Sequence, residues 1–272
     1  MKKIFKNLFS VTLCTALLTG TVASTVLAKT STNDEVTFYI VRHGKTMLNT
    51  TDRVQGWSDA VLTPAGEEVV TYAGMGLSDV KFNSAYSSDS GRAIQTANII
   101  LSENTVSYPS LKTDSRLREF NFGTYEGEPN ETLWHDIALY NGYASLTELM
   151  TSGAFSSELF ANTTAKLDAA RIEEEGVNWP AENYDQITSR LTESLKEISE
   201  TQSKNGGGNV LLVSHGLSIS ALLSEICPDA ELPQGFTNAS VTVVTYKDGK
   251  YTAESINDMS YVEEGKLEAA TN

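Results

Sequence analysis

FYIVRHGKT, residues 38–46, is the stretch of sequence that decides the fold. Its first half is an uncharged run of β-branched and aromatic residues, as expected for a central strand that is buried on both faces of a parallel sheet. The run ends in Arg42 and His43, and a second run, VLLVSHG at 210–216, ends in His215. Carboxyl ends of parallel strands share one edge of a sheet, which is where open α/β proteins bind ligands. We therefore expect both histidines at one binding edge.

A third segment of the same kind contributes a second arginine. SAYSSDSGRAIQTA, residues 84–97, reads as a short strand that turns into a helix, with Arg92 near the turn. Two imidazoles and two guanidiniums at one sheet edge form an anion site, because arginine offers a rigid planar fork of donors that matches phosphate oxygens. Phosphate is therefore the predicted ligand.

The rest of the chain predicts alternating strands and helices. Apolar runs and turn residues place strands at 36–41, 84–87 and 209–214, and a closing hairpin at 240–246 and 251–256. Helices are expected from Pro64, after the N-cap Thr63, and over 90–101, 186–203 and 217–226. The predicted fold is an α/β three-layer sandwich, with a mostly parallel central sheet and helices on both faces. Short amphipathic pieces over about 128–184 predict a helical cap insertion.

The first 28 residues have the pattern of a signal peptide. Lys2, Lys3 and Lys6 precede an apolar core at 8–18, and Val26-Leu27-Ala28 fits a cleavage site. An uncleaved signal anchor is the alternative. We expect residues 29–272 to form one domain in a secreted or extracellular protein, either free or associated with the cell wall. No other segment approaches the roughly 20 apolar residues of a membrane span.

The charge composition argues against nucleic acid and anionic membranes as partners. Without residues 1–28 the chain keeps 17 basic and 35 acidic residues, a net charge of about −18. Such a surface repels nucleic acid and anionic membranes, so a phosphate site must be a local basic island. Cys227 is then the one remaining cysteine, which leaves no intramolecular disulfide, and we expect it to be inert.

Five pieces of the sequence, taken in order, identify a family. These are RHGKTMLN (42–49), QGWSDAVLTPAG (55–66), SSDSGRAIQTA (87–97), LREFNFGTYEG (117–127) and VSHG (213–216). The ordered set resembles the histidine phosphatase superfamily, also called phosphoglycerate mutase-like. The resemblance implies an α/β sandwich and a covalent phosphohistidine mechanism that uses no metal and no cofactor.

The resemblance also implies a role for each matching residue. His43 would attack phosphorus, and we expect a backbone carbonyl to fix its tautomer so that the other ring nitrogen is nucleophilic. The transferring phosphoryl group would be held by Arg42, Arg92 and His215, with Asn49 as a neutral donor. Asn238 is a possible support for this site.

Two carboxylates compete for the role of general acid. Glu119, in LREF, matches the acid position of the family, whereas Glu126, followed by glycine, reads as a structural loop residue. Partial burial would favour the protonated form that Glu119 needs in the first step. The sister branch places an acid directly after the second histidine, but Gly216 stands there and excludes that variant.

The predicted function is hydrolysis of small phosphate esters. Lys45 stands where many family members have glutamate, so it would add positive charge beside the phosphate pocket and favour substrates with a second anionic group. Mutases of the family carry a GLNK segment with paired arginines after the acid, and GTYEGEPNETLWHDI (123–137) has neither. A mutase-like phosphotransferase is the first alternative. A non-catalytic module that binds phosphorylated ligands is the second.

Overall fold

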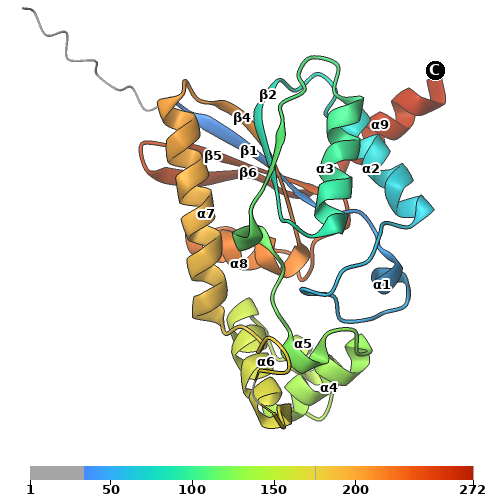
Figure 1. The fold of residues 1–272 in the computed structure, drawn as a ribbon, viewed down its shortest axis with the longest axis vertical. Helices are drawn as coiled ribbons and strands as arrows, with labels where there is room; N and C mark the ends of the chain where they lie inside the picture. Colours follow the sequence, from blue (N-terminus) through green and yellow to red (C-terminus); the bar gives the residue numbers. More distant parts are fainter. Residues whose placement is uncertain (1–33, 175, 272) are drawn as a thin grey trace, which may run out of the picture. The chain divides into compact units, whose positions relative to one another are not determined.

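The computed structural model describes residues 34–174 and 176–271 as one α/β unit around a six-stranded sheet (Figure 1). The strand order is β3-β2-β4-β1-β5-β6, in which β3, β2, β4 and β1 are parallel to one another, β5 is antiparallel to β1 and β6 is antiparallel to β5. The expected α/β fold with a mostly parallel sheet is confirmed. The strands are β1 (Val36–Arg42), β2 (Phe82–Ser87), β3 (Leu111–Thr113), β4 (Gly208–Ser214), β5 (Val241–Lys247) and β6 (Lys250–Asp258).

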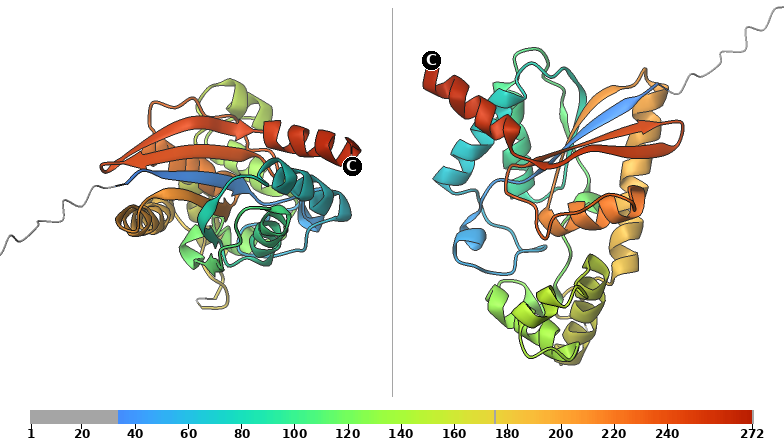
Figure 2. Two further views of the ribbon diagram at one scale, coloured as in Figure 1. Left: turned by 90° about the horizontal axis from the view of Figure 1, so that it is seen from above. Right: turned by 180° about the vertical axis from the view of Figure 1, so that it is seen from behind.

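Helices cover both faces of this sheet (Figure 2). One side carries α2 (Pro64–Gly76), α3 (Gly91–Glu103) and α9 (Ser260–Thr271). The other carries α7 (Tyr184–Lys204) and α8 (Gly216–Ile226). Strand residues alternate between the two cores: Phe38 and Ile40 point to one, whereas Val41 points to the other. Burial on both faces explains why the central strands have uninterrupted apolar sequences.

Local sequence signals set the helix starts. The Thr63 side chain accepts the backbone N–H of Gly66 and Pro64 occupies the first turn of α2, as predicted. Helix α7 begins at Tyr184, two residues before the expected start, because Asn183 and Gln186 form a reciprocal capping box. The sequence-based prediction placed the start at residue 186 because it did not recognise this capping box.

Helix α9 is absent from the sequence-based expectation, which ended the fold at the hairpin. It lies along α2 at a close crossing marked by Gly76 and Gly265. A Cβ on either glycine would collide with a backbone carbonyl of the facing helix, at Tyr261 or Tyr72. The pattern of α9 is weakly amphipathic in sequence, so this contact between backbones, and not periodicity, accounts for its position.

The predicted cap consists of α4 (Asn130–Tyr140), α5 (Leu146–Thr151) and α6 (Ser157–Arg171), which Figure 1 shows next to the N-terminal end of α7. Asp168 of α6 is completely buried, and its carboxylate accepts hydrogen bonds from the N–H groups of Thr124 and Ala181. Both N–H groups belong to segments that flank the cap. The buried carboxylate therefore fastens the cap to the chain on either side of it.

The signal-peptide prediction falls on residues outside those that the structure describes. Within 34–174 and 176–271, the helices are too short or too polar to cross a membrane. The remaining short helices are α1 (Met47–Thr50) and the single-turn 3₁₀ helices at Ser115–Leu117 and Gly123–Tyr125.

Candidate active site

The two histidines predicted at the sheet edge lie side by side. Arg42 at the end of β1 is in register with Ser214 at the end of β4, and the His43 N–H donates to the Ser214 carbonyl at 3.0 Å. The rings of His43 and His215 are edge to face with centroids 5.2 Å apart, and both side chains are buried. Parallel strand pairing thus brings together two residues that are 172 positions apart in sequence.

The expected backbone carbonyl orients His43. Nδ1 of His43 lies 2.8 Å from the Gly44 carbonyl oxygen, so this nitrogen carries the proton and donates it. The lone pair then resides on Nε2, which is the nucleophilic position. Asn238 supports the same turn, since its amide donates to the His43 carbonyl at 2.9 Å.

A set of buried donors around the histidines has no hydrogen-bond partner within the described residues. Buried polar atoms in proteins are almost always paired, so several unpaired ones at one place indicate a ligand that completes them. A neutral His215 has one ring nitrogen that carries a proton and one that carries a lone pair. All the other atoms in the set are donors, which points to an anion as the ligand. The atoms are Nε of Arg42, Nε of Arg92, Nε2 of Gln55 and both ring nitrogens of His215.

Arg92 also holds the loop that borders this site. Its guanidinium is completely buried, and it donates to the carbonyls of Gly56 at 2.7 Å and Ser58 at 3.0 Å. Asp59 forms an ion pair with it at 3.0 Å. These contacts occupy the terminal nitrogens and leave Nε for a ligand. Arg92 therefore has a fixed position before any anion binds.

Burial and the two arginines keep the histidines neutral. Burial lowers the pKa of His43 well below its usual 6.5, and the nearby charges of Arg92 and Arg42 lower it further. The pKa of His215 is lowered in the same way, first by burial and then by Arg92. Burial also lowers the pKa of Arg42 and of Arg92, but guanidiniums remain charged. The result is a pair of neutral imidazoles next to fixed positive charge.

These shifts predict a loss of stability in mild acid. Below pH 6.5 the unfolded chain gains a proton on each histidine that the folded chain does not bind, so unfolding becomes easier by about 1.4 kcal/mol per pH unit for each of them. Urea unfolding between pH 7 and pH 5 should show this slope. It should be smaller in His43→Gln and in His215→Gln than in the wild type, and His135→Gln, whose imidazole is exposed, is the control variant. Equal slopes in all four proteins would contradict the expectation.

Glu119 lies where the turn after β4 begins α8. Its Oε1 accepts hydrogen bonds from the Ser218 N–H and hydroxyl, both at 2.9 Å, and from the Phe120 N–H at 3.1 Å. Its Oε2 accepts one, from the Leu217 N–H at 3.1 Å. The side chain is buried, as expected, and these hydrogen bonds to the first turn of α8 fix its position. Oε2, with the fewer partners, is the oxygen free to exchange a proton.

Glu126 has the structural role that its loop position indicated. Its carboxylate accepts the backbone N–H groups of Gly56, Trp57 and Ser58, and it also accepts the N–H of Phe122. Its oxygens are therefore used to hold the loop at 56–58 and the turn at Phe122. Arg92 holds the carbonyls of that same loop, so the two side chains together fix the wall of the site.

Arg190 of α7 is a positioning residue that sequence reasoning missed. Its guanidinium donates to the carbonyls of Arg116, Arg118 and Glu119 at 2.7–2.9 Å, and it forms a two-pronged ion pair with Glu182. These contacts therefore hold the backbone around Glu119 in place from the side of α7. An arginine in an amphipathic helix is usually a solvent-facing residue, so no local signal distinguishes this one.

Replacement of this clamp should impair catalysis through Glu119. Lysine cannot make the planar set of contacts, so Arg190→Lys should lower kcat about tenfold with little change in KM. The loss should be greater for alkyl than for aryl phosphates, because alkyl leaving groups depend on the acid. Steady-state kinetics on both classes would check this. Arg116→Lys, at a more exposed ion pair, is the control; an identical loss for both ester classes would assign Arg190 to folding alone.

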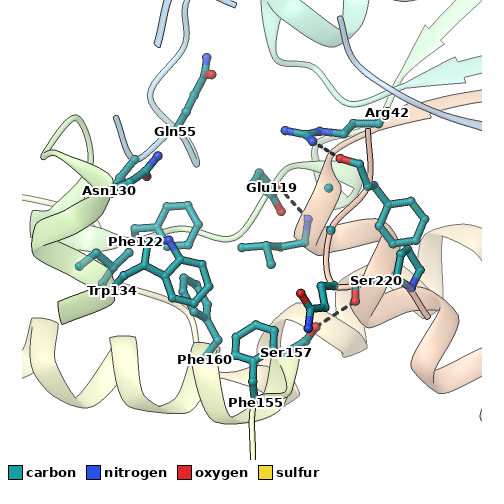
Figure 3. Close-up of a pocket in the computed structure, with 18 of the residues that line it drawn as sticks. Arg42, Gln55, Glu119, Phe122, Asn130, Trp134, Phe155, Ser157, Phe160 and Ser220 are labelled. Carbon is teal, nitrogen blue, oxygen red and sulfur yellow. Dashed lines mark hydrogen bonds between the residues drawn. The ribbon is translucent and has the colours of Figure 1, made fainter. Parts of the chain in front are cut away.

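A cavity of about 530 Å³ opens between the sheet edge and the cap, next to the strand ends that carry the histidines (Figure 3). His43, Arg92 and His215 are buried and are not among the residues that line it. Arg42, Asn49, Glu119 and Gly216 line it, as does Gln55. The Asn49 Oδ1 is used to cap α1, so its amide nitrogen is left for a ligand. A side chain at Gly216 would press on Arg42, because a Cβ there would lie 3.3 Å from its Nε.

Not every predicted residue is brought to this cavity. Lys45 is exposed and is absent from the lining, and its carbonyl accepts the N–H of Thr63 at the start of α2. Arg53 lines the rim and donates to the Gly127 carbonyl. Gln55 was missed as a site residue although it lies in a quoted motif; its unpaired amide is the signal, and only the structure displays it.

The described residues contain no cluster of three or more His, Cys, Asp or Glu side chains arranged to hold a metal ion. The residues at the site are instead donors and one nucleophilic nitrogen, which suits a phosphoryl group directly. The arrangement can bind a phosphate ester, attack its phosphorus and exchange a proton with its leaving group.

Comparison with known proteins agrees with this geometry. Residues 38–142 and 151–259 match the model of the histidine phosphatase superfamily, branch 1. A probable phosphoglycerate mutase, GpmB, from Yersinia pestis is 28% identical over 233 residues, which cover 83% of this chain and 94% of the relative.

Solved structures of similar proteins share this fold. A phosphoglycerate mutase from Bacillus anthracis is 42% identical, with a TM-score of 0.79 over 87% of this chain and 99% of that one. A mycobacterial glucosyl-3-phosphoglycerate phosphatase, 22% identical with a TM-score of 0.59 over 82% and 99%, shares the fold. The resemblance seen in the five sequence motifs is thereby confirmed: the chain belongs to branch 1 of the histidine phosphatase superfamily.

Proposed function

We propose that the chain is a phosphomonoesterase that hydrolyses small phosphate esters through a phosphohistidine at His43. The observation that carries the proposal is the set of buried, unpaired donors on Arg42, Arg92, Gln55 and His215 around a histidine with a free Nε2. A dianionic phosphoryl group satisfies these donors and places phosphorus within reach of the nucleophile.

In the first step, Nε2 of His43 attacks phosphorus as the bond from phosphorus to the ester oxygen breaks. Glu119 donates a proton through Oε2 to the leaving oxygen, so an alcohol departs. Arg42, Arg92 and His215 stabilise the charge on the equatorial oxygens.

In the second step, water replaces the alcohol. The Glu119 carboxylate takes a proton from water as its oxygen attacks phosphorus, and the bond between phosphorus and Nε2 breaks. Inorganic phosphate leaves and neutral His43 is restored. No other reactant is required, since one water supplies the oxygen, and both of its protons are accounted for in the alcohol and the phosphate.

A phosphoglycerate mutase-like transfer is the second candidate. It is favoured by the 42% identical structure from Bacillus anthracis, which is described as a phosphoglycerate mutase. Transfer requires that the alcohol product or a second hydroxyl compound, and not water, accepts the phosphoryl group. We favour hydrolysis because residues 123–137 lack the paired arginines with which mutases retain phosphoglycerate.

Product analysis separates the two candidates. The enzyme is incubated with a panel of phosphate esters, with 3-phosphoglycerate, and with and without glycerate as an acceptor. Hydrolysis predicts release of inorganic phosphate from the esters at a rate that glycerate does not reduce. Conversion of 3-phosphoglycerate to 2-phosphoglycerate faster than phosphate release would establish the mutase instead.

We also propose that the enzyme acts outside the cell. The support is the pattern of residues 1–28 and the strongly acidic composition of the remainder. Fractionation of a producing cell, followed by N-terminal sequencing of the protein in the medium, would test this. A protein that stays within the cell with residues 1–28 attached would overturn it.

A further inference from the structure

The cavity beside the phosphate site has an apolar wall that the hydrolysis of a small ester does not need. Phe122, Leu133 and Phe160 are almost fully buried behind it, and Trp134 and Phe155 are half-buried at its surface. Across from them lie Leu217 of α8 and, in the loop before β5, Leu232, Pro233 and Phe236. Figure 3 shows Trp134, Phe155 and Phe160 gathered on the cap side, facing Arg42 and Glu119.

This wall is fixed before any substrate arrives. Trp134 packs on Phe160 with ring centroids 4.6 Å apart and on Phe155 at 5.6 Å, while Phe160 meets Phe122 edge to face at 5.9 Å. The hydroxyls of Ser157 in α6 and Ser220 in α8 are hydrogen-bonded at 3.1 Å and join the cap to the core. A preformed aromatic surface binds an apolar group without the entropy cost of ordering side chains.

The wall is continuous with the catalytic groups. The N–H of Leu217 donates to Glu119, and the Phe236 carbonyl accepts a hydrogen bond from Arg42. A group attached to the leaving oxygen of a phosphate bound at Arg42 therefore extends into the apolar part of the cavity.

The charged residues that line the cavity indicate that the alcohol part of the substrate carries no second anion. Among the described residues that line it, the charged side chains are Arg42, Glu119 and Arg53. Arg42 belongs to the phosphate site, and Arg53 lies exposed at the rim, already bonded to the Gly127 carbonyl. A second carboxylate or phosphate deep in the cavity would face aromatic rings with no cation to pair with, which is costly.

We infer that the substrate is a phosphate monoester whose alcohol carries a bulky apolar group, such as an aromatic ring, and no second anion. The inference rests on the proposed phosphatase function and specifies its substrate class. The ring would lie against Trp134 and Phe155, with its phosphoryl group at His43. The cavity volume, about 530 Å³, falls within the range of pockets that enclose drug-sized ligands, well above the need of a three-carbon acid.

Two esters of equal leaving-group acidity test the inference: propyl phosphate and 3-phenylpropyl phosphate, which differ by the ring alone. We expect kcat/KM to be roughly 10- to 100-fold higher for the phenylpropyl ester. In Trp134→Ala and Phe155→Ala this ratio should fall toward one. Because both esters are measured on one preparation, the ratio is independent of the fraction of enzyme that is folded.

Tyr140→Ala is the matched control, because Tyr140 is an exposed aromatic residue on the same helix as Trp134 and does not line the cavity. Its ratio should equal that of the wild type. If both esters are hydrolysed equally well, or if 3-phosphoglycerate is the better substrate, the inference is overturned while the phosphatase function stands. If no ester is hydrolysed, the proposed function itself fails.

Discussion

His43→Ala should abolish turnover of every phosphate ester, with a loss of about 10⁴-fold or more in kcat. The variant removes the Nε2 that forms the phosphoenzyme and leaves the cationic site of Arg42 and Arg92 intact. Affinity for inorganic phosphate should therefore persist. Phosphate release and calorimetric phosphate binding would measure the two effects separately.

The intermediate provides a second check on the nucleophile. Rapid quenching of wild type with a ³²P-labelled ester should trap an acid-labile, base-stable phosphohistidine, and peptide mapping should place it at residue 43. His135→Ala is the matched control, because this histidine is exposed on the cap. It should retain both turnover and labelling. Substantial turnover by folded His43→Ala would refute the mechanism.

Glu119→Gln should produce the second largest effect, and one that depends on the leaving group. Alkyl phosphates should lose about 10²- to 10⁴-fold in kcat, since an alkoxide leaves poorly without a proton. Aryl phosphates such as p-nitrophenyl phosphate should lose much less in the first step. Pre-steady-state kinetics would resolve that step, because the amide also cannot activate water in the second step.

The other carboxylate of the same loop gives the control. Glu126→Gln disturbs the N–H contacts at 56–58 and so should lower activity toward alkyl and aryl esters by one common factor. A leaving-group dependence in Glu126→Gln, and none in Glu119→Gln, would exchange the roles of the two residues. The amide of Glu119→Gln also has one acceptor oxygen fewer, so the N–H of Leu217 or of Ser218 loses its partner.

Much of the site could be predicted because its residues follow strands whose apolar composition indicates that they are buried. Buried runs before His43 and His215, together with the parallel pairing they require, already place the two rings at one edge. The tautomer of His43 was expected from the same local reasoning, and Asn238 was named from the family resemblance. Arg190 and Gln55 were not predicted. The role of Arg190 depends on the carbonyls beside it and that of Gln55 on the lack of a partner for its amide nitrogen, and sequence periodicity carries no information about either.

The sequence by itself determined the α/β class and the order of the motifs, because these depend on strand periodicity and on residues adjacent in the chain. Through the family resemblance it also predicted a nucleophile, an acid and the residues that bind the phosphate. Tertiary structure decided three further features: the packing of α9 on α2 at paired glycines, the N–H groups that position the Glu119 side chain, and the aromatic wall of the cap. Each of these arises from contacts between segments far apart in the chain. Such contacts form when the chain folds, so they are encoded jointly by many residues and by no single stretch.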